Sequence, residues 1–376
     1  MSTPAPLPAL GWIWSDVDPA PHFATDYADA RAKFLAAAAR HRLAVESHVH
    51  PTARGPAGEP LAVDVVALGE ATADALLITS GTHGAEGFCG SGCQVALLAD
   101  DAFVSTLRSS GVTLLLVHAL NPFGFAHLSR TTEDNIDLNR NFRDFARLAL
   151  NADYAEVHDF MVPASWPPAQ DNEARMIGYV MKRGAFALQQ AVSGGQSDYP
   201  HGLFFAGRGP AWSQGVLRDV LRRHAATRAR LGWIDVHTGL GPCGHGEKIF
   251  SGPDDAAMLS RARRWWGADV TSIYEGSSTS ARVEGMLCHA ALDECPDTEY
   301  TGIALEYGTQ SYVDVMNALR ARQWLTNHAD AAPAVRDAIL RQVRAAFYVD
   351  TPAWKAMVFA QARVAALQAV TALSRR

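Results

Sequence analysis

The 376-residue sequence lacks several features that would place it in a specialised class of protein. It contains no run of about 18 apolar residues, which a membrane-spanning helix needs. Its start, MSTPAPLPALGWIW, lacks the basic and then apolar regions of a secretory signal peptide. The 33 basic residues are outnumbered by 39 acidic ones and form no cluster that would bind nucleic acid. The sequence therefore predicts neither a membrane nor a nucleic-acid partner.

Cysteine is also scarce and irregularly spaced. The five cysteines are an odd number and include no C-x-x-C pair, so they do not look like a disulfide framework in a chain of this length. This usage is typical of a reducing compartment, and we expect a cytoplasmic protein. The sequence leaves the oligomeric state open, and an oligomer is compatible with it.

Apolar residues make up 48% of the chain, which is enough for a sizeable core. Short runs rich in Val, Ile and Leu are typical of buried strands, and helical patterns lie between them. The predicted strands are 61–68, 75–81, 112–120, 232–239 and 302–308, and the predicted helices are 26–41, 89–99, 172–191, 211–231, 312–327, 335–347 and 354–373. This alternation predicts an α/β fold with a mixed, largely parallel sheet sandwiched by helices.

We expect a single catalytic domain over residues 1–376, with three recognisable additions. Residues 1–22 are a proline-rich N-terminal arm, and residues 352–374 form a C-terminal helix. Residues 164–209 are rich in turns and are predicted to be an insertion that shapes one wall of a site.

Polar residues that directly follow apolar runs are the first candidates for a functional site, because ligands of α/β sheets bind beyond the carboxyl ends of the strands. The stretch GTHGAEG places His83 and Glu86 after the run 75–81, among glycines that let the backbone bend and a substrate approach. The spacing H-x-x-E fits two metal ligands on a turn that enters a helix. An ordinary strand-to-helix turn with two polar residues is the alternative.

The stretch GWIDVHTG adds a second histidine. Asp235 and His237 are two residues apart, so on a strand they point to the same side. Taken alone, His237 is better interpreted as a core histidine with a hydrogen-bonded partner. Together with His83 and Glu86 it completes a His₂Glu set, which is a recurrent catalytic zinc site. Asp235 could hold the tautomer of one histidine, although the sequence does not say which one.

Residues 121–142 are dense in Asn and Arg. Arg130 and Arg140 offer guanidinium forks that bind carboxylates in a bidentate manner. Two arginines beside a metal would repel it unless an anion lay between them, which favours an anionic substrate or transition state. The alternative is a surface loop, and the nearby residues Asp134, Asn135 and Asp137 are expected to serve only as its caps and turns.

Glu306 interrupts the apolar stretch IALEYGT near the carboxyl end of a predicted strand. Burying an unpaired carboxylate is costly, so a catalytic role as general base would explain its presence there. A strand-end glutamate paired with an arginine is the structural alternative.

The order of these motifs resembles the zinc carboxypeptidase superfamily, which includes carboxypeptidase A-like enzymes and the aspartoacylase/succinylglutamate desuccinylase branch. The residues that carry the resemblance are HxxE at 83–86, NPFGF at 121–125, DLNRNF at 137–142, DVHTG at 235–239 and LEYGT at 305–309. The set looks like an uncharacterised bacterial subgroup. The resemblance implies a mixed eight-stranded sheet between helices.

The resemblance also implies roles for individual residues. One Zn²⁺ per chain would be bound by His83, Glu86 and His237. Glu306 would be the catalytic base, and Arg130 would stabilise the oxyanion. Asn139 and Arg140 would bind the substrate carboxylate. Tyr274 would also bind substrate, because it lies in a loop, SIYEGSS, that is similar to the substrate-binding loop of carboxypeptidases. Residues 283–300 look like an inserted segment relative to this family.

Three functions remain open at this point. The first is a metallocarboxypeptidase-like hydrolase of an amide or peptide bond next to a free carboxylate. The second is an N-acyl-amino-acid or small-amide deacylase, related to aspartoacylase, that uses the same residues on a small acyl-amino-acid substrate. The third, from a different class, is a metal-free binding protein that keeps only the carboxylate-binding residues.

Overall fold

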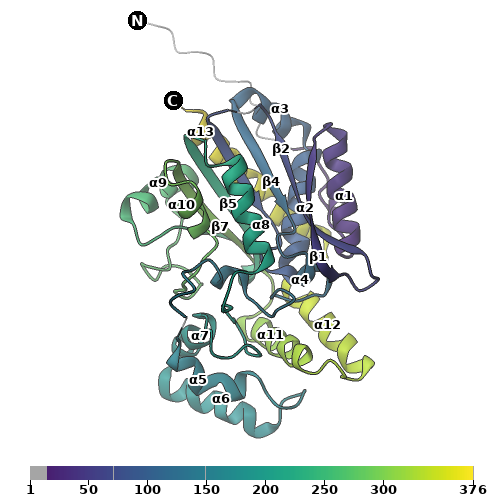
Figure 1. The fold of residues 1–376 in the computed structure, drawn as a ribbon, viewed down its shortest axis with the longest axis vertical. Helices are drawn as coiled ribbons and strands as arrows, with labels where there is room; N and C mark the ends of the chain where they lie inside the picture. The colour runs from purple at the N-terminus through teal and green to yellow at the C-terminus, as the bar shows by residue number, and fades with distance from the viewer. Residues whose placement is uncertain (1–14, 71, 149, 376) are drawn as a thin grey trace, which may run out of the picture.

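The computed structural model describes residues 15–70, 72–148 and 150–375, so most of the predicted proline-rich arm lies outside the described residues. Its centre is a sheet of seven strands in the order β1-β2-β4-β3-β5-β7-β6 (Figure 1). The strands are β1 Val45–Arg54, β2 Pro60–Leu68, β3 Asp74–Thr79, β4 Val112–His118, β5 Arg230–Cys243, β6 Gly246–Phe250 and β7 Glu299–Gly308. The four central strands β4, β3, β5 and β7 pair in parallel, and the three outer pairings are antiparallel.

The mixed α/β sheet confirms the predicted fold class, but the expected eighth strand is wrong for the described residues. The chain reaches the free edge of β6 at Thr271 and forms a single bridge with Ile249. Phe250 N donates to Thr271 O at 2.8 Å, and Thr271 N donates to Lys248 O at 2.9 Å. The chain then turns within residues 273–276, so the contact cannot extend into a strand.

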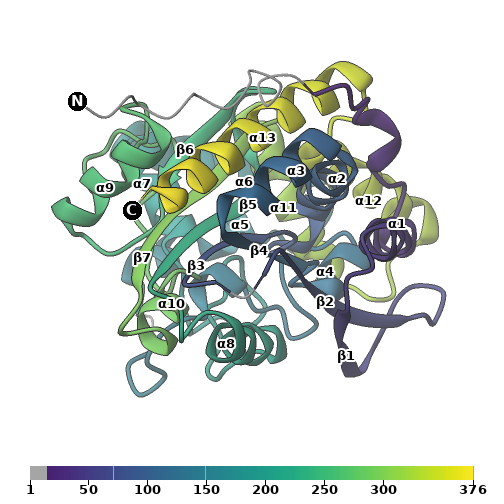
Figure 2. The ribbon, with the colours of Figure 1, turned by 90° about the horizontal axis from the view of Figure 1, so that it is seen from above.

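The two faces of the sheet bury separate apolar clusters, because successive side chains of a strand point in opposite directions. Leu76 and Ile78 of β3 pack into one cluster, whereas Ala75 and Leu77 pack into the other. The first cluster is covered by five helices, of which Figure 2 shows α13 and α2 above the sheet: α1 Tyr27–Arg40, α2 Gly87–Ala99, α3 Asp101–Ser110, α9 Ala256–Trp266 and α13 Pro352–Ser374.

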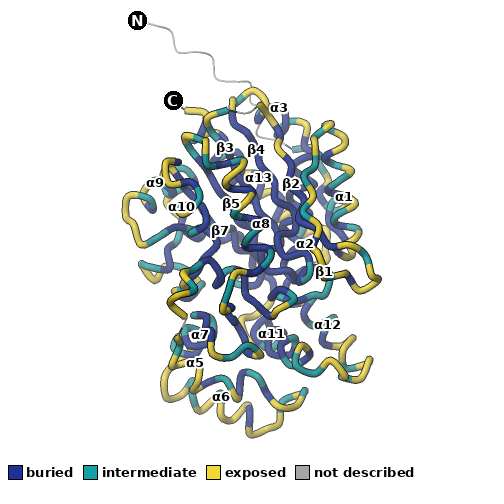
Figure 3. The backbone as a smooth tube through the Cα atoms, viewed as in Figure 1, coloured by how far each residue is buried: buried dark blue, intermediate teal, exposed yellow. Residues whose placement is uncertain are grey.

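The opposite face is covered mainly by α8 Trp212–His224 and α10 His289–Glu294, which Figure 2 shows below the sheet. A third buried cluster joins helices beyond the carboxyl ends of the parallel strands, at the bottom of Figures 1 and 3. Its helices are α5 Ala152–Met161, α7 Ala185–Ser193, α11 Tyr312–Asn327 and α12 Pro333–Phe347, with α6 Gln170–Arg183 packed alongside. The region 164–209, predicted to be an insertion, contributes α6 and α7 to this helical layer.

The elements that sequence patterns miss are those without long apolar runs. Strand β1 carries the polar sequence VESHVHPTAR and lies at the sheet edge, where a mostly exposed strand needs few apolar residues. Strand β6 has five residues. Helices α3, α5 and α9 are likewise absent from the prediction, and the helix predicted over 172–191 is divided at Gly184, which has a φ of 90°.

Among the described residues, α13 is the one helix that is long and apolar enough to span a membrane by length and composition. One face of α13 packs inward, where Trp354, Val358 and Leu373 are buried in the cluster of the first sheet face. Trp266 Nε1 also donates to the backbone oxygen of Ala365 at 3.0 Å. These contacts are those of a core helix.

The loop that follows β3 is held against the turn that follows β4. Gly84 N donates to Arg130 O at 3.3 Å, and Ala85 N donates to Ser129 O at 2.9 Å. A Cβ atom at Gly84 would lie 1.9 Å from the carbonyl carbon of Gly124, in the short helix α4 Pro122–Ala126. Glycine is therefore required at position 84 for the two backbone segments to touch, and this contact places His83 and Glu86.

We predict that Gly84→Ala destabilises the protein, because two backbone segments must separate to admit the methyl group. The free energy of unfolding should fall by about 1–3 kcal/mol, as measured by urea denaturation. The matched control is Gly178→Ala in the exposed face of α6, where a Cβ would meet nothing within 4 Å. This control should gain about 0.5–1 kcal/mol from helix propensity. Equal stability of the two variants would contradict the packing argument.

Candidate metal centre

The candidate site lies at the carboxyl ends of β3, β5 and β7, on the sheet face that α8 covers. Asp235 and His237 of β5 point to that face, as the spacing of two residues predicts, and Glu306 of β7 is the register partner of His237. Thr79, the last residue of β3, is the register partner of Asp235. Strand pairing therefore brings together residues that are far apart in the chain.

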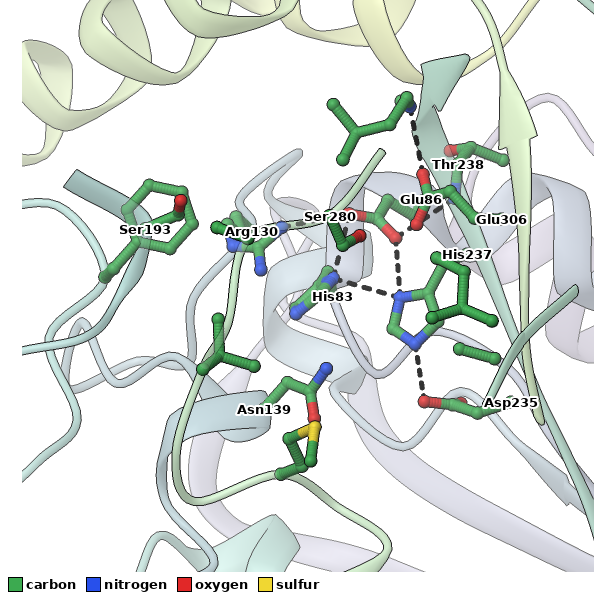
Figure 4. Close-up of a pocket in the computed structure, with 18 of the residues that line it drawn as sticks. His83, Glu86, Arg130, Asn139, Ser193, Asp235, His237, Thr238, Ser280 and Glu306 are labelled. Atoms are coloured by element: carbon green, nitrogen blue, oxygen red, sulfur yellow. Dashed lines mark hydrogen bonds and ion pairs between the residues drawn. The ribbon is translucent and has the colours of Figure 1, made fainter. Parts of the chain in front are cut away.

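His83, Glu86 and His237 converge on one point (Figure 4). The Nδ1 atoms of the two histidines are 3.2 Å apart. Glu86 Oε1 lies 2.9 Å from His83 Nδ1, and Glu86 Oε2 lies 3.0 Å from His237 Nδ1. All three residues are buried. The structure thus brings together the three predicted metal ligands.

Asp235 fixes the ring of His237. Its Oδ2 atom is 2.5 Å from His237 Nε2, and its Oδ1 atom accepts hydrogen bonds from the hydroxyls of Thr79 at 2.6 Å and Thr82 at 2.8 Å. With Nε2 directed at a carboxylate, His237 presents Nδ1 to the centre of the cluster. This arrangement answers the question that the sequence left open, since Asp235 belongs to His237.

The surroundings of His83 depend on a residue that the sequence analysis assigned to a surface loop. Asp137 is fully buried, with Oδ1 at 3.4 Å from His83 Nε2 and Oδ2 accepting from Arg130 Nε at 2.8 Å. It does cap the short 3₁₀ helix Leu138–Arg140 by accepting from Asn139 N. The expectation that Asp137 serves only as a cap is therefore wrong. Its place in the sequence between Arg130 and Arg140 was the signal that could have indicated a buried, paired carboxylate.

Glu86 also connects the metal-binding cluster to its surroundings. Arg130 Nη1 donates to Glu86 Oε1 at 3.2 Å, and the backbone nitrogen of Thr238 donates to Glu86 Oε2 at 3.2 Å. The guanidinium of Arg130 lies over the ring of Phe204, 4.8 Å from its centroid. Arg130 Nη2 has no hydrogen bond to another described residue and remains available to a ligand.

Asn139 and Arg140 lie on the same side of the cavity. Arg140 is buried and donates to Ser193 O from Nε and Nη2 and to Asn139 O from Nη1. Burial lowers the pKa of Arg140 to about 10, so the group stays charged near neutral pH. Asn139 Oδ1 accepts from the backbone nitrogen of Leu287 at 2.9 Å, which leaves its amide nitrogen for a ligand.

Glu306 faces the cluster without a cationic partner. Its Oε1 atom accepts from Leu240 N at 3.0 Å, and no described Lys, Arg or His lies within ion-pair distance of the carboxylate. The strand-end ion pair that the sequence left as an alternative is thus absent from the described residues. Burial and the negative charge of Glu86 raise the pKa of Glu306 above its ordinary value. A raised pKa makes the carboxylate a stronger base.

The charges of this region are unbalanced. Burial would raise the pKa of Glu86, but His83 and His237 lower it. Burial would lower the pKa of His237, yet the charge of Asp235 raises it well above the ordinary value. The buried carboxylates and the two guanidinium groups next to them are Glu86, Asp137, Asp235 and Glu306 against Arg130 and Arg140. Carboxylates therefore outnumber guanidinium groups by two, and without a cation the raised pKa of His237 lets that ring carry part of the missing positive charge.

A divalent cation fits this site by donor type, spacing and charge. Two imidazoles and one carboxylate are a common ligand set for zinc. With bonds of about 2.0–2.1 Å, tetrahedral ligand atoms lie about 3.3 Å apart, close to the separations of 2.9–3.2 Å between the ligand atoms here. A charge of +2 would also balance the buried set. The residues that would hold the ion are His83, Glu86 and His237.

The predicted site residues line one cavity with the exception of Tyr274. Besides the cluster, the residues near the ligands that line the cavity are Arg130, Asn139, Arg140 and Glu306. The 164–209 region contributes Gln189, Ser193 and Phe204, and the 283–300 segment contributes Val283, Met286 and Leu287. Tyr274 does not line it, and its hydroxyl donates to Gly252 O at 3.0 Å. Among the described residues, the tyrosine at this cavity is Tyr312, which the sequence analysis did not select.

The fold and the site define an α/β protein with a buried His₂Glu cluster suited to a divalent metal ion. The chain belongs to the family described as "Protein of unknown function (DUF2817)", whose model matches residues 23–361. No curated protein matches the chain.

Solved structures similar to this chain include carboxypeptidases. Carboxypeptidase A from Helicoverpa armigera has a TM-score of 0.41 and 13% identity, and the match covers 85% of this chain and 73% of that one. A metallo-carboxypeptidase from Burkholderia cenocepacia has a TM-score of 0.42 and 11% identity, with 92% and 68% covered. The ectoine utilization protein EutE from Ruegeria pomeroyi has a TM-score of 0.36 and 17% identity, with 76% and 67% covered.

We predict that His83→Ala and His237→Ala lose bound zinc, because two remaining ligands cannot hold the ion tightly. Elemental analysis after zinc loading and gel filtration should give one equivalent for the parent protein and far less for either variant. His245→Ala is the matched control, since His245 is exposed and does not line the cavity. Full zinc retention by both ligand variants would exclude the proposed ligand set.

We also predict that Asp235→Asn weakens zinc binding without abolishing it, because His237 would lose the carboxylate that orients its ring. The dissociation constant should rise by about 10–100-fold in a chelator competition titration. Asp134→Asn is the control, because it makes the same substitution at an exposed aspartate. An unchanged affinity in Asp235→Asn would show that Asp235 does not support the ligand.

Proposed function

We propose that this protein is a zinc-dependent hydrolase that cleaves an amide or peptide bond next to a free carboxylate, as metallocarboxypeptidases do. The observation that carries the proposal is one cavity that contains a His₂Glu cluster, an unpaired buried glutamate and two inward-facing arginines. The order of sequence motifs supports it independently of this geometry. Each required chemical role has a residue in this cavity.

A zinc ion held by His83, Glu86 and His237 would supply Lewis-acid chemistry, acidifying water and polarising a carbonyl oxygen. Glu306 is positioned to take a proton from the attacking water and to pass it to the leaving nitrogen. Its burial without a cationic partner supports this role, because a carboxylate of raised pKa accepts a proton more readily. Leu240 N holds the carboxylate in place through Oε1 and leaves Oε2 free for proton transfer.

Arg130 supplies positive charge across the cluster from Glu306 (Figure 4), and Arg140 lines the same cavity. Arg130 keeps Nη2 free, and it would stabilise the oxyanion that forms when the amide carbonyl is attacked. Arg140 is held rigidly by Ser193 O and Asn139 O, with one hydrogen left on each terminal nitrogen. Those two donors, with the amide of Asn139, would bind the carboxylate of the substrate.

The walls of the cavity favour a small substrate, which keeps an N-acyl-amino-acid deacylase as the second candidate. Gln189 Nε2 of α7 donates to Thr279 O at 3.0 Å, and Gln190 Nε2 donates to Arg282 O at 2.7 Å. These bonds join the helical layer to the loop that precedes the 283–300 segment. A contact on this side of the cavity favours a substrate that ends there.

A metal-free binding protein is the remaining alternative, and the ligand geometry disfavours it. Two imidazoles and a carboxylate would then converge in a buried cluster with no ion to hold. Zinc analysis of the purified protein therefore distinguishes this alternative from both hydrolases.

The proposal is tested by incubating zinc-loaded protein with a panel of N-acyl amino acids and short peptides, and by comparing Glu306→Gln. We expect the parent protein to release a free amino acid from at least one class. The variant should bind zinc normally but lose more than about 100-fold in kcat, because proton transfer contributes about that much.

The matched control for this variant is Glu70→Gln, an exposed site far from the cavity, which should keep parental activity. Parental turnover by Glu306→Gln would remove the base assignment. If the zinc-loaded parent hydrolysed neither class of substrate, the proposed function would be wrong.

A further inference from the structure

One wall of the cavity is formed by a single face of α11. Its lining residues are Tyr312, Val315, Met316 and Leu319, at helical positions i, i+3, i+4 and i+7. Val315 also lies against the end of β5, since its Cγ1 would be 3.6 Å from a Cβ placed at Gly239. The first turn of α11 therefore abuts the segment that follows His237. Tyr312 is the one polar side chain on this face.

The chain holds Tyr312 in a fixed place relative to Glu306. The two residues are joined by the end of β7 and a short connection, in which Thr309 Oγ1 donates to Ala346 O at 2.6 Å. Ser311 then caps α11 by accepting from Asp314 N at 3.2 Å. These bonds fix the start of α11 relative to the end of β7, and Tyr312 is the first residue of α11.

Tyr312 is exposed, with 37% of its surface accessible, and its hydroxyl has no hydrogen-bond partner among the described residues. Burial raises the pKa of Tyr312 to about 12, so the phenol keeps its proton and acts as a donor near neutral pH. Because no protein group accepts from this hydroxyl, it is free to donate to a ligand that enters the cavity.

Tyr274 differs from Tyr312 in its hydrogen bonding and in its position. Its hydroxyl is already donated to Gly252 O, the guanidinium of Arg282 lies 5.2 Å from its ring centroid, and it does not line the cavity. The residue that the motif resemblance assigns to substrate binding is thus engaged elsewhere.

We propose that Tyr312, in place of Tyr274, is the tyrosine of this site that contacts the substrate, with its hydroxyl donating a hydrogen bond to a carbonyl or carboxylate oxygen of the bound amide. This inference rests on the proposed function, because it needs an amide substrate in the cavity. The apolar residues Val315, Met316 and Leu319 would then pack against the hydrocarbon part of the same substrate.

The test compares Tyr312→Phe and Tyr274→Phe in the zinc-loaded full-length protein, with the best substrate of the panel. Tyr312→Phe should lower kcat/KM by about tenfold, as expected for one lost hydrogen bond, with KM raised. Its zinc content and Tm should match those of the parent, because phenylalanine keeps the ring. Tyr274→Phe should stay within about twofold of the parent, and so should Tyr179→Phe, a control on α6 outside the cavity.

Each result has a distinct meaning. Parental kinetics for Tyr312→Phe would overturn this inference while leaving the hydrolase proposal intact. A tenfold loss in Tyr274→Phe with none in Tyr312→Phe would return the role to Tyr274. If the parent turned over no substrate, both the function and the role of Tyr312 would fall, and the missing parental activity would identify that case.

Discussion

The carboxylate of Glu86 is the contact on which the rest of the site depends. It faces both histidines, Arg130 and the backbone nitrogen of Thr238, so it joins the loop after β3, the end of β5 and the loop after β4. These segments come from three parts of the chain, and each presents a donor or an imidazole to the same carboxylate. A buried carboxylate with this many donors holds them together, and it becomes fully compensated once a divalent cation is bound.

The walls around this centre are what distinguish the protein from a bare metal site. The helical layer α5–α7 and the 283–300 segment close one side through Gln189, Gln190 and the contact of Leu287 with Asn139. Helix α11 forms an apolar wall beside Glu306. In the proposed hydrolase, the metal centre would supply chemistry that many substrates could use, whereas these walls would select which substrates reach it.

Much of the fold could be predicted from the sequence, because buried strands and amphipathic helices leave periodic apolar patterns. The strands β2, β3, β4, β5 and β7 were found in this way, as were α11, α12 and α13. Strand β1 and strand β6 could not be found, since an edge strand or a five-residue strand leaves no such pattern. The count of seven strands was equally hidden, because it depends on whether the chain at Thr271 stays beside β6 or turns away.

The sequence by itself determined which residues could carry the chemistry. Because ligand sites lie at the carboxyl ends of strands, the motifs at the ends of β3, β5 and β7 predicted His83, Glu86, His237 and Glu306. Only the tertiary structure decided how these residues are partnered. It assigned Asp235 to His237, buried Asp137 between two cations, turned Tyr274 away and brought Tyr312 to the cavity. Such choices depend on contacts between distant segments, and the local order of residues carries no record of which side chain faces which.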